Sequence, residues 1–250
     1  MNGEKIAALA KGEYHIEVLQ QTDSTNRQLR LRAEQGAPEG SALFAVAQSE
    51  GRGRLGRSFY SPAGSGLYFS ILLRPRAMDG WKITAAAGVA VAQAVEEVLG
   101  IDLAIKWVND LYYQNKKVCG ILAESVLSPD GGFDYCILGI GLNLFAPQGG
   151  FGDLDAIAGA LLPQYRQGIA EPLAAAILDR FFDWYHRLED ASLMEQYRRR
   201  SFLQGKEVTV VRGAERIRGT VEGIDDEGAL LLRVEDRLVA IQSGTLEDYR

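Results

Sequence analysis

The sequence has few cysteines and lacks any long hydrophobic segment. Its two isolated thiols, Cys119 and Cys136, form neither a disulfide framework nor a metal site, and we interpret both as small core residues. No segment approaches the roughly 20 apolar residues needed to span a bilayer, and residues 1–15 lack the pattern of a signal peptide. We therefore expect a cytoplasmic protein that does not insert into a membrane and has no dedicated metal cluster.

The chain also lacks an excess of basic charge. It carries 27 Lys and Arg against 33 Asp and Glu, a net charge of −6 in 250 residues. Because non-specific binding to nucleic acid requires a basic surface, this balance argues against a DNA or RNA binder. The 47% hydrophobic content is enough to fill the core of one large domain, or of a domain with a small appendage.

The clearest local signal is residues 51–57 (GRGRLGR), here called the Gly/Arg loop, in which three glycines alternate with three arginines. Glycine lets main-chain N–H groups approach a ligand closely, and arginine offers a planar fork of donors that matches phosphate and carboxylate. The apolar segments 42–47 and 67–73 on either side are typical of buried strands. The loop therefore predicts an anion site at the rim of a sheet.

Hydrophobic spacing predicts further strands and helices along the chain. Strands are expected at 14–20, 103–107, 118–125 and 133–140. Helices are expected from residue 26 to Gly36, over 83–99, from Pro172 to 188, and from a capping box at Ser192 and Glu195 to residue 200. Beyond residue 204, closely spaced strand candidates typical of a small barrel follow at 207–211, 216–224, 229–234 and 237–242. We divide the chain into domains at 1–203 and 204–250.

Several polar sites have two interpretations each. The run at 21–26 (QTDSTN) is a helix N-cap, or a cap in which some side chains also contact a ligand. Asn109 and Asp110 either turn a hairpin or read a purine amine, and Lys117 either points at a ligand or is a surface lysine. Residues 139–143 (GIGLN) lack the third glycine of a dinucleotide fingerprint, so we exclude a Rossmann fold.

Taken together, four motifs resemble those of the biotin protein ligases. They are residues 51–57 (GRGRLGR), 106–111 (KWVNDL), 116–122 (KKVCGIL) and 139–143 (GIGLN). Each motif is weak alone, but their order and separations fit the family. The C-terminal barrel is similar to the family's SH3-like domain, so the resemblance spans nearly the whole chain. It implies an α+β fold, with a class II synthetase-like mixed sheet that has helices on one side, followed by a small SH3-like β-barrel.

The resemblance implies a biotin-[acetyl-CoA-carboxylase] ligase activity in two steps. Biotin and ATP, with Mg2+, give biotinyl-5'-AMP and pyrophosphate, and a lysine of a biotin carboxyl carrier protein domain then attacks the mixed anhydride. In the first step a carboxylate approaches a phosphate, so the barrier is largely electrostatic and requires fixed positive charge. The resemblance is compatible with a monomer or with a homodimer formed by pairing of sheet edges.

Family correspondence also assigns site residues. The catalytic cations would be Lys117, Arg54 and Arg52. The biotin contacts would be Ser24, Thr25, Asn26, Gln48, Gly51, Arg52, Gly53, Lys117, Gly120 and Gly139. The adenylate contacts would be Arg52, Arg54, Arg57, Asn109, Asp110, Lys117, Leu142 and Asn143. We expect the Gly/Arg loop to fold over the adenylate and shield the anhydride from water.

Three positions depart from the family pattern. Val108 stands where the family has proline, and Phe59 stands where it usually has tryptophan. Both changes keep an apolar side chain, but the second removes an indole that could pack on ligand. Thr245 follows Gly244 where the family often has glutamate, and this departure weakens the case for a nucleotide contact by the barrel.

Other functions remain open beside biotin ligation. A lipoate ligase or octanoyltransferase has the same fold, although the complete Gly/Arg loop favours biotin. A non-enzymatic module that binds an anion or nucleotide through the loop is the other alternative, and the acidic net charge weakens an RNA-binding form of it. Some family members bind operator DNA through an N-terminal winged helix. Only about 13 residues precede the first predicted strand here, too few for a helix-turn-helix, so we expect a ligase without repressor function.

Overall fold

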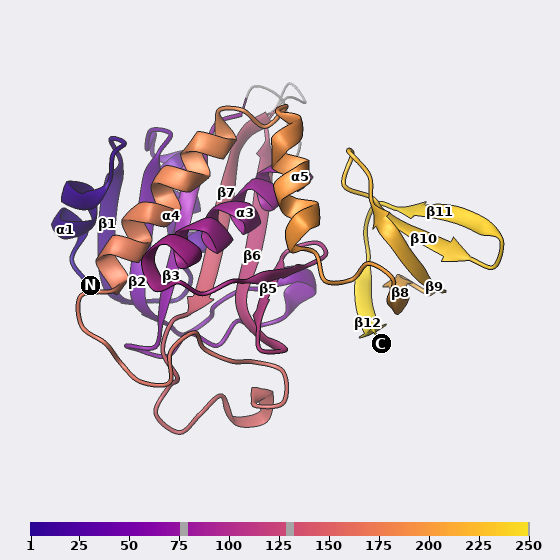
Figure 1. Ribbon diagram of the computed structural model, residues 1–250. Helices are drawn as coiled ribbons and strands as arrows, with labels where there is room; N and C mark the ends of the chain where they lie inside the picture. The colour runs from indigo at the N-terminus through magenta and orange to yellow at the C-terminus, as the bar shows by residue number, and fades with distance from the viewer. Residues whose placement is uncertain (76–79, 129–132, 250) are drawn as a thin grey trace.

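A mixed sheet is the centre of the fold (Figure 1). The computed structural model describes residues 1–75, 80–128 and 133–249, and within them the sheet has seven strands in the order β1-β2-β3-β7-β6-β5-β4. Only β1 and β2 run parallel, and the other neighbours are antiparallel. The strands are β1 His15–Thr22, β2 Ser41–Gln48, β3 Gly66–Leu73, β4 Ala104–Lys106, β5 Asp110–Tyr113, β6 Lys116–Leu127 and β7 Phe133–Asn143.

The two faces of this sheet are covered differently. The helices α1 Gly3–Leu9, α3 Gly80–Leu99, α4 Ala170–Tyr185 and α5 Ala191–Arg200 belong to the large core on one face (Figure 1). This face, called here the helical face, buries alternate residues of β7, among them Leu138 and Leu142. The intervening residues Tyr135 and Ile137 pack with Leu29 of α2 (Thr25–Glu34) in a smaller cluster on the opposite face. The predicted α+β class with a main helical layer on one side is confirmed, and α2 is the addition on the other side.

The C-terminal segment forms a separate antiparallel sheet. Its five strands, all within the described residues, pair in the order β11-β10-β9-β8-β12. They are β8 Glu207–Arg212, β9 Glu215–Ile224, β10 Leu230–Val234, β11 Arg237–Ile241 and β12 Thr245–Tyr249. The first four match the predicted strands. The sequence analysis missed β12, which pairs with β8, because its sequence TLEDY is short and largely polar.

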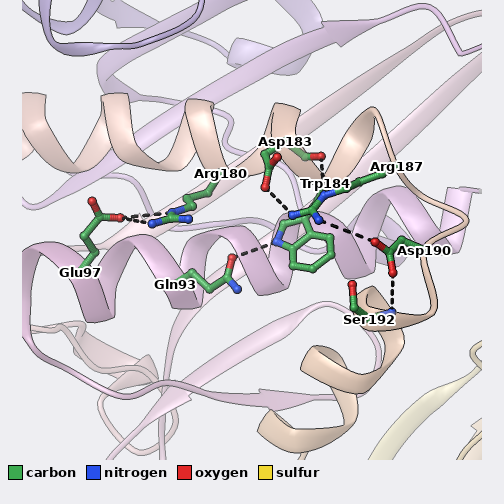
Figure 2. Close-up of polar contacts among 8 residues, drawn as sticks. All are labelled: Gln93, Glu97, Arg180, Asp183, Trp184, Arg187, Asp190 and Ser192. Atoms are coloured by element: carbon green, nitrogen blue, oxygen red, sulfur yellow. Dashed lines mark hydrogen bonds and ion pairs between the residues drawn. The ribbon is translucent and has the colours of Figure 1, made fainter.

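A polar network joins α3, α4 and the start of α5 (Figure 2). The indole N–H of Trp184 donates to Gln93 at 2.9 Å, and the Arg187 guanidinium lies 4.3 Å from the centroid of the same indole. Asp190 accepts a hydrogen bond from the backbone N–H of Ser192 at 2.9 Å, and α5 therefore begins one residue earlier than predicted, with Asp190 as its N-cap. The predicted capping box at Ser192 is wrong, because the preceding aspartate already satisfies the free N–H.

The helices in the described ranges give no transmembrane candidate. None of them combines the length and the apolar character needed to cross a bilayer.

Candidate active site

A cavity of about 790 Å3 lies where the Gly/Arg loop, the start of α2, the middle of β6 and β7, and the barrel strand β12 meet. Nearly all of the predicted site residues line it. They are Ser24, Thr25, Asn26, Gln48, Arg52, Gly53, Arg54, Arg57, Asn109, Asp110, Lys117, Gly120, Gly139 and Asn143. The fold thus brings together residues more than 100 positions apart, although their contacts with ligands stay predictions.

Two predicted residues do not line this cavity. Leu142 is fully buried in the core of the helical face, because side chains alternate between the two faces of β7. The same alternation in the sequence could have excluded its side chain as an adenylate contact. Gly51 lines a neighbouring pocket, which shares Ser24, Asn26 and Arg52 with this cavity, and its carbonyl accepts a hydrogen bond from the N–H of Phe59 at 2.8 Å.

Glycines in β6 and β7 make the floor of the cavity. Gly120 and Gly141 are directly opposite each other in the two strands, and the ring of Phe59 lies over them. A Cβ added at Gly141 would be 2.5 Å from this ring. At Gly139 an added Cβ would be 2.2 Å from Oδ1 of Asn26. These glycines therefore allow close packing within the chain, while the biotin contacts predicted for Gly120 and Gly139 stay predictions.

A buried hydrogen-bond network connects the start of α2 to the sheet. Gln48 Oε1 accepts from the N–H of Thr25 at 2.8 Å and from its hydroxyl at 3.1 Å. The hydroxyl of Ser70 donates to Asn26 Oδ1 at 2.6 Å, and the amide of Asn26 donates to Glu124 at 2.7 Å. Ser70 is fully buried, and Thr25 and Asn26 are 4% and 5% exposed, so these side chains do more than cap a helix. Ser70 and Glu124 were missed, because each lies in an otherwise apolar strand.

The N-cap residue of α2, Ser24, does not cap the helix through its side chain. Asp23 accepts instead, from the N–H of Ser24 at 2.6 Å and from Gln28 at 3.0 Å. The buried Ser24 hydroxyl therefore lines the cavity without a capping role.

Lys117 and Arg54, two of the cations at the cavity, are paired with polar groups of the chain. Lys117 Nζ lies 2.6 Å from Asp110 Oδ1, and Arg54 donates to Asn109 Oδ1 at 3.0 Å. The Asn109 amide also donates to the carbonyl of Ile121 at 2.8 Å, which fixes its orientation. These partners hold the positive groups in place at the cavity.

The segment after β7 closes one side of the cavity. The N–H of Lys117 donates to the Ile157 carbonyl at 2.8 Å, and the N–H of Gly159 donates to the Lys117 carbonyl at 2.9 Å. Asn143 donates to the Gly159 carbonyl at 3.0 Å. The Lys117 backbone is thereby held on both sides, which restricts where its ammonium group can reach.

Lys106 is a further cation at the cavity to which the sequence analysis gave no role. It is half-buried, and burial lowers the pKa of its ammonium group, a change opposed by the charge of Asp110. Its position at the end of the short strand β4, directly opposite Asp110 of β5, places it at the cavity. Lys106 could have been found from the sequence, because it begins the motif KWVNDL, which also contains the predicted contacts Asn109 and Asp110.

A dedicated metal cage is not part of this site. No group of three or more His, Cys, Asp or Glu side chains with metal-binding geometry exists within the described ranges. Mg2+ is commonly held by substrate phosphates, waters and one or two carboxylates, and Asp110 is the carboxylate among the predicted adenylate contacts at the cavity.

The sheet, the cavity and the terminal barrel together define a ligase of the biotin and lipoate type. Residues 18–143 match the Biotin/lipoate A/B protein ligase family, and residues 204–246 match the Biotin protein ligase C terminal domain. The chain belongs to the biotin protein ligase family and is a ligase. The second match favours this family over the lipoate ligase and octanoyltransferase alternatives.

Similar proteins support this assignment over nearly the full chain. The Biotin--[acetyl-CoA-carboxylase] ligase of Mycobacterium tuberculosis is 32% identical over 99% of this chain and 94% of its own length. The Bifunctional ligase/repressor BirA of Bacillus subtilis is 32% identical over 94% of this chain, which covers 73% of that protein. The Aquifex aeolicus biotin protein ligase, solved in complex with biotin and ATP, is 31% identical with a TM-score of 0.80, over 94% of this chain and 98% of that one.

Proposed function

We propose that this chain activates biotin with ATP to biotinyl-5'-AMP and pyrophosphate and then transfers biotin to a lysine of a biotin carboxyl carrier protein domain. One observation carries the proposal: the Gly/Arg loop, Lys117 and the buried network of Thr25 and Gln48 line the same cavity. The named ligands of the Aquifex aeolicus relative, biotin and ATP, fit a cavity that is polar at one side and cationic at the other.

The buried network suits the head of biotin. The ureido ring has both N–H donors and a carbonyl acceptor, so it needs partners of both kinds in a site shielded from water. Ser24, Thr25 and Gln48 supply hydroxyl and amide groups at the cavity wall. The two hydrogen bonds from Thr25 to Gln48 Oε1, and the bond from the Gln48 amide to Ser61, fix the orientation of Gln48. Phe59, above the glycine floor, supplies apolar surface for the rest of the ligand.

The cations suit the reaction between carboxylate and α-phosphate. Two anions must approach each other, and fixed positive charge lowers this barrier most where water is excluded. Lys117 and the arginines of the loop are the groups that would bind the carboxylate and phosphates. To do so, Lys117 would leave its partner Asp110, and Arg52 would leave Glu124, which lies 3.3 Å from it. Asn109 and Asn143 are the proposed adenylate contacts.

The second step is an acyl transfer to the carrier lysine. The lysine nitrogen bonds to the carbonyl carbon of the anhydride, the bond from that carbon to the phosphate oxygen breaks, and AMP leaves with the electron pair. The amine loses a proton during the step, and Asp110 is the carboxylate placed to receive or orient it once Lys117 has turned to the anhydride.

Calorimetry with biotin and with lipoate, each followed by ATP, tests the substrate, and biotin-dependent exchange of pyrophosphate into ATP tests the first step. Lys117→Met is expected to lower this exchange on the order of 10²-fold or more, because it removes a charge fixed at the reacting groups. Lys116→Met is the matched control, since the Lys116 ammonium bonds to the carbonyls of Asp155 and Ala156. Equal activity of the two variants would contradict the role of Lys117.

Transfer needs a separate assay. A purified biotin carboxyl carrier domain should gain one biotin per acceptor lysine in the presence of this chain, biotin and ATP. Pyrophosphate exchange without any such transfer would confine the activity to adenylate formation.

A further inference from the structure

The last strand of the barrel reaches the active-site cavity. Residues 244–247 and Tyr249 line the cavity together with the residues of the catalytic sheet. The ring of Tyr249 packs against Phe202, with centroids 5.6 Å apart, and Phe202 packs against Tyr112 of β5, with centroids 5.5 Å apart. The barrel therefore contributes part of the cavity wall, despite the Thr245 substitution that had argued against a nucleotide contact.

Tyr249 also contacts a cation. Lys106 Nζ lies 4.5 Å from the centroid of the Tyr249 ring and 5.8 Å from that of Tyr112. A cation over an aromatic face at this distance is attracted by the ring, more strongly when partly removed from water. The two rings thus hold the end of the Lys106 side chain at the boundary between the barrel and the catalytic sheet.

Lys106 has no anionic partner of its own in the parts of the chain that the structure describes. Its opposite residue, Asp110, is engaged with Lys117 at 2.6 Å. An ammonium group has three donors and no acceptor, and ring faces alone leave these donors without strong hydrogen bonds. A half-buried cation in this state at a cavity wall is suited to bind an anionic group of a ligand.

The polyphosphate of the nucleotide is the anion that fits best. Arg57 and Lys117 line the same cavity as Lys106, and their positive charges act on its ammonium group. Such a concentration of positive charge favours the most highly charged part of the ligand. We propose that Tyr249 is a positioning residue that holds the ammonium of Lys106 at the cavity wall, where it binds the polyphosphate of ATP. This inference rests on the proposed function, and it gives the barrel a part in adenylate formation.

Steady-state pyrophosphate exchange with separate KM values for ATP and biotin tests the proposal. Tyr249→Leu, which removes the ring, should raise the KM for ATP about three- to tenfold and leave the KM for biotin within about twofold. Tyr249→Phe keeps the ring face and should restore the KM for ATP to near the original value. Ile241→Val is the control, because it trims the buried barrel core away from the cavity.

A double variant separates positioning from a structural effect. Lys106→Met should raise the KM for ATP at least as much as Tyr249→Leu, and the two together should be no worse than Lys106→Met alone. Additive effects of the two substitutions, or an equal rise in the Ile241→Val control, would overturn the proposal. So would an unchanged KM for ATP in Tyr249→Leu with slower transfer to the carrier.

Failure of the proposed function would be visible separately. If the unsubstituted chain shows no biotin-dependent exchange, the ligase proposal fails, and calorimetry with inorganic pyrophosphate then tests the anion site alone. Weaker pyrophosphate binding by Tyr249→Leu than by Tyr249→Phe would support the positioning role. Equal affinities of the two variants would overturn it.

Discussion

The two faces of the central sheet differ in the side chains that the same strands present: large apolar residues on the helical face, and glycines on the cavity face. On the helical face, β7 presents side chains such as Leu138 and Leu142, both fully or almost fully removed from water. On the cavity face, the same strand presents Gly139 and Gly141, where neighbouring side chains would collide with any Cβ. The helical face thus stabilises the fold through apolar burial. On the cavity face, glycines without side chains let polar groups of neighbouring segments approach the sheet closely.

Charged groups show the same contrast. On the helical layer, Arg180 pairs with Glu97 and Arg187 pairs with Asp183, all at least 44% exposed in their side chains (Figure 2). Exposed pairs of this kind contribute about 0–1 kcal/mol each. The pair of Lys117 and Asp110 is less exposed, 32% and 22%, and lies at a cavity. A cation paired with a carboxylate therefore contributes little on the exposed helical layer, whereas at the cavity it keeps a positive charge in a fixed position.

The largest effect on the cavity face is expected from Gly139→Ala. The new Cβ would displace the side-chain oxygen Oδ1 of Asn26. This oxygen accepts a hydrogen bond from the Ser70 hydroxyl, and it cannot move without losing that hydrogen bond. Loss of buried hydrogen bonds costs about 1–3 kcal/mol each, so biotin affinity measured by calorimetry should fall about 10- to 100-fold, with a lower melting temperature.

The matched control lies on the helical face. An added Cβ at Gly88 of α3 would meet Ile105 and Ile121 at 3.6 and 3.8 Å, ordinary contact distances. Gly88→Ala should leave biotin affinity unchanged and stabilise the helix by about 0.5–1 kcal/mol. Equal biotin affinity in the two variants would show that Asn26 is not part of the ligand site.

A smaller effect is expected from Arg54→Lys. An arginine fork can bind Asn109 and a phosphate together, whereas an ammonium group is a single point charge. Pyrophosphate exchange should fall about tenfold with the melting temperature unchanged.

Arg187→Lys makes the same substitution on the helical layer. It removes the stacking on Trp184 and one exposed pair, so stability should fall by less than about 1 kcal/mol and exchange should be unchanged. If Arg54→Lys behaved like Arg187→Lys, the loop arginine would be a surface residue as well.

The contrast between the faces also explains what the sequence could predict. The helices α2 to α5 and most strands were predictable because apolar residues recur at the helical or strand period on the buried side. The seven-residue helix α1 was not predicted, because it buries only Ile6. The motif residues were predictable as a group because the Gly/Arg loop and its companions occur in a fixed order. The strand β12 was missed because a short edge strand such as TLEDY has little apolar alternation.

The missing parts of the site share one physical cause. Asn26 and Glu124 are 98 residues apart in sequence, yet hydrogen-bonded at 2.7 Å. Lys106 belongs to the catalytic sheet, whereas Tyr249 belongs to the C-terminal barrel. Local patterns do not record such partners, because the strand order of the sheet and the docking of the barrel bring them together. Leu142 was selected in error for the related reason that a motif does not say which face each residue occupies.

The smallest effect is expected from thiol reagents, and it tests the helical face directly. Cys119 and Cys136 are both fully buried in the core of that face. Burial raises the pKa of Cys136 to about 11 and raises the pKa of Cys119 as well. The thiolate is the reactive form, so at pH 8 only about one Cys136 thiol in a thousand would be ionised even if reagent could reach it.

Native protein at pH 8 should therefore show no labelling by iodoacetamide over hours, while protein in guanidinium chloride should label at both cysteines. Saturating biotin and ATP should not change this result, because the proposed ligand cavity lies on the opposite face of the sheet. Rapid labelling of either thiol in the native state would mean that the helical layer opens, and rapid labelling that ligands suppress would mean that the two faces are coupled. In that case the division of the sheet into a stable side and a reactive side would have to be given up.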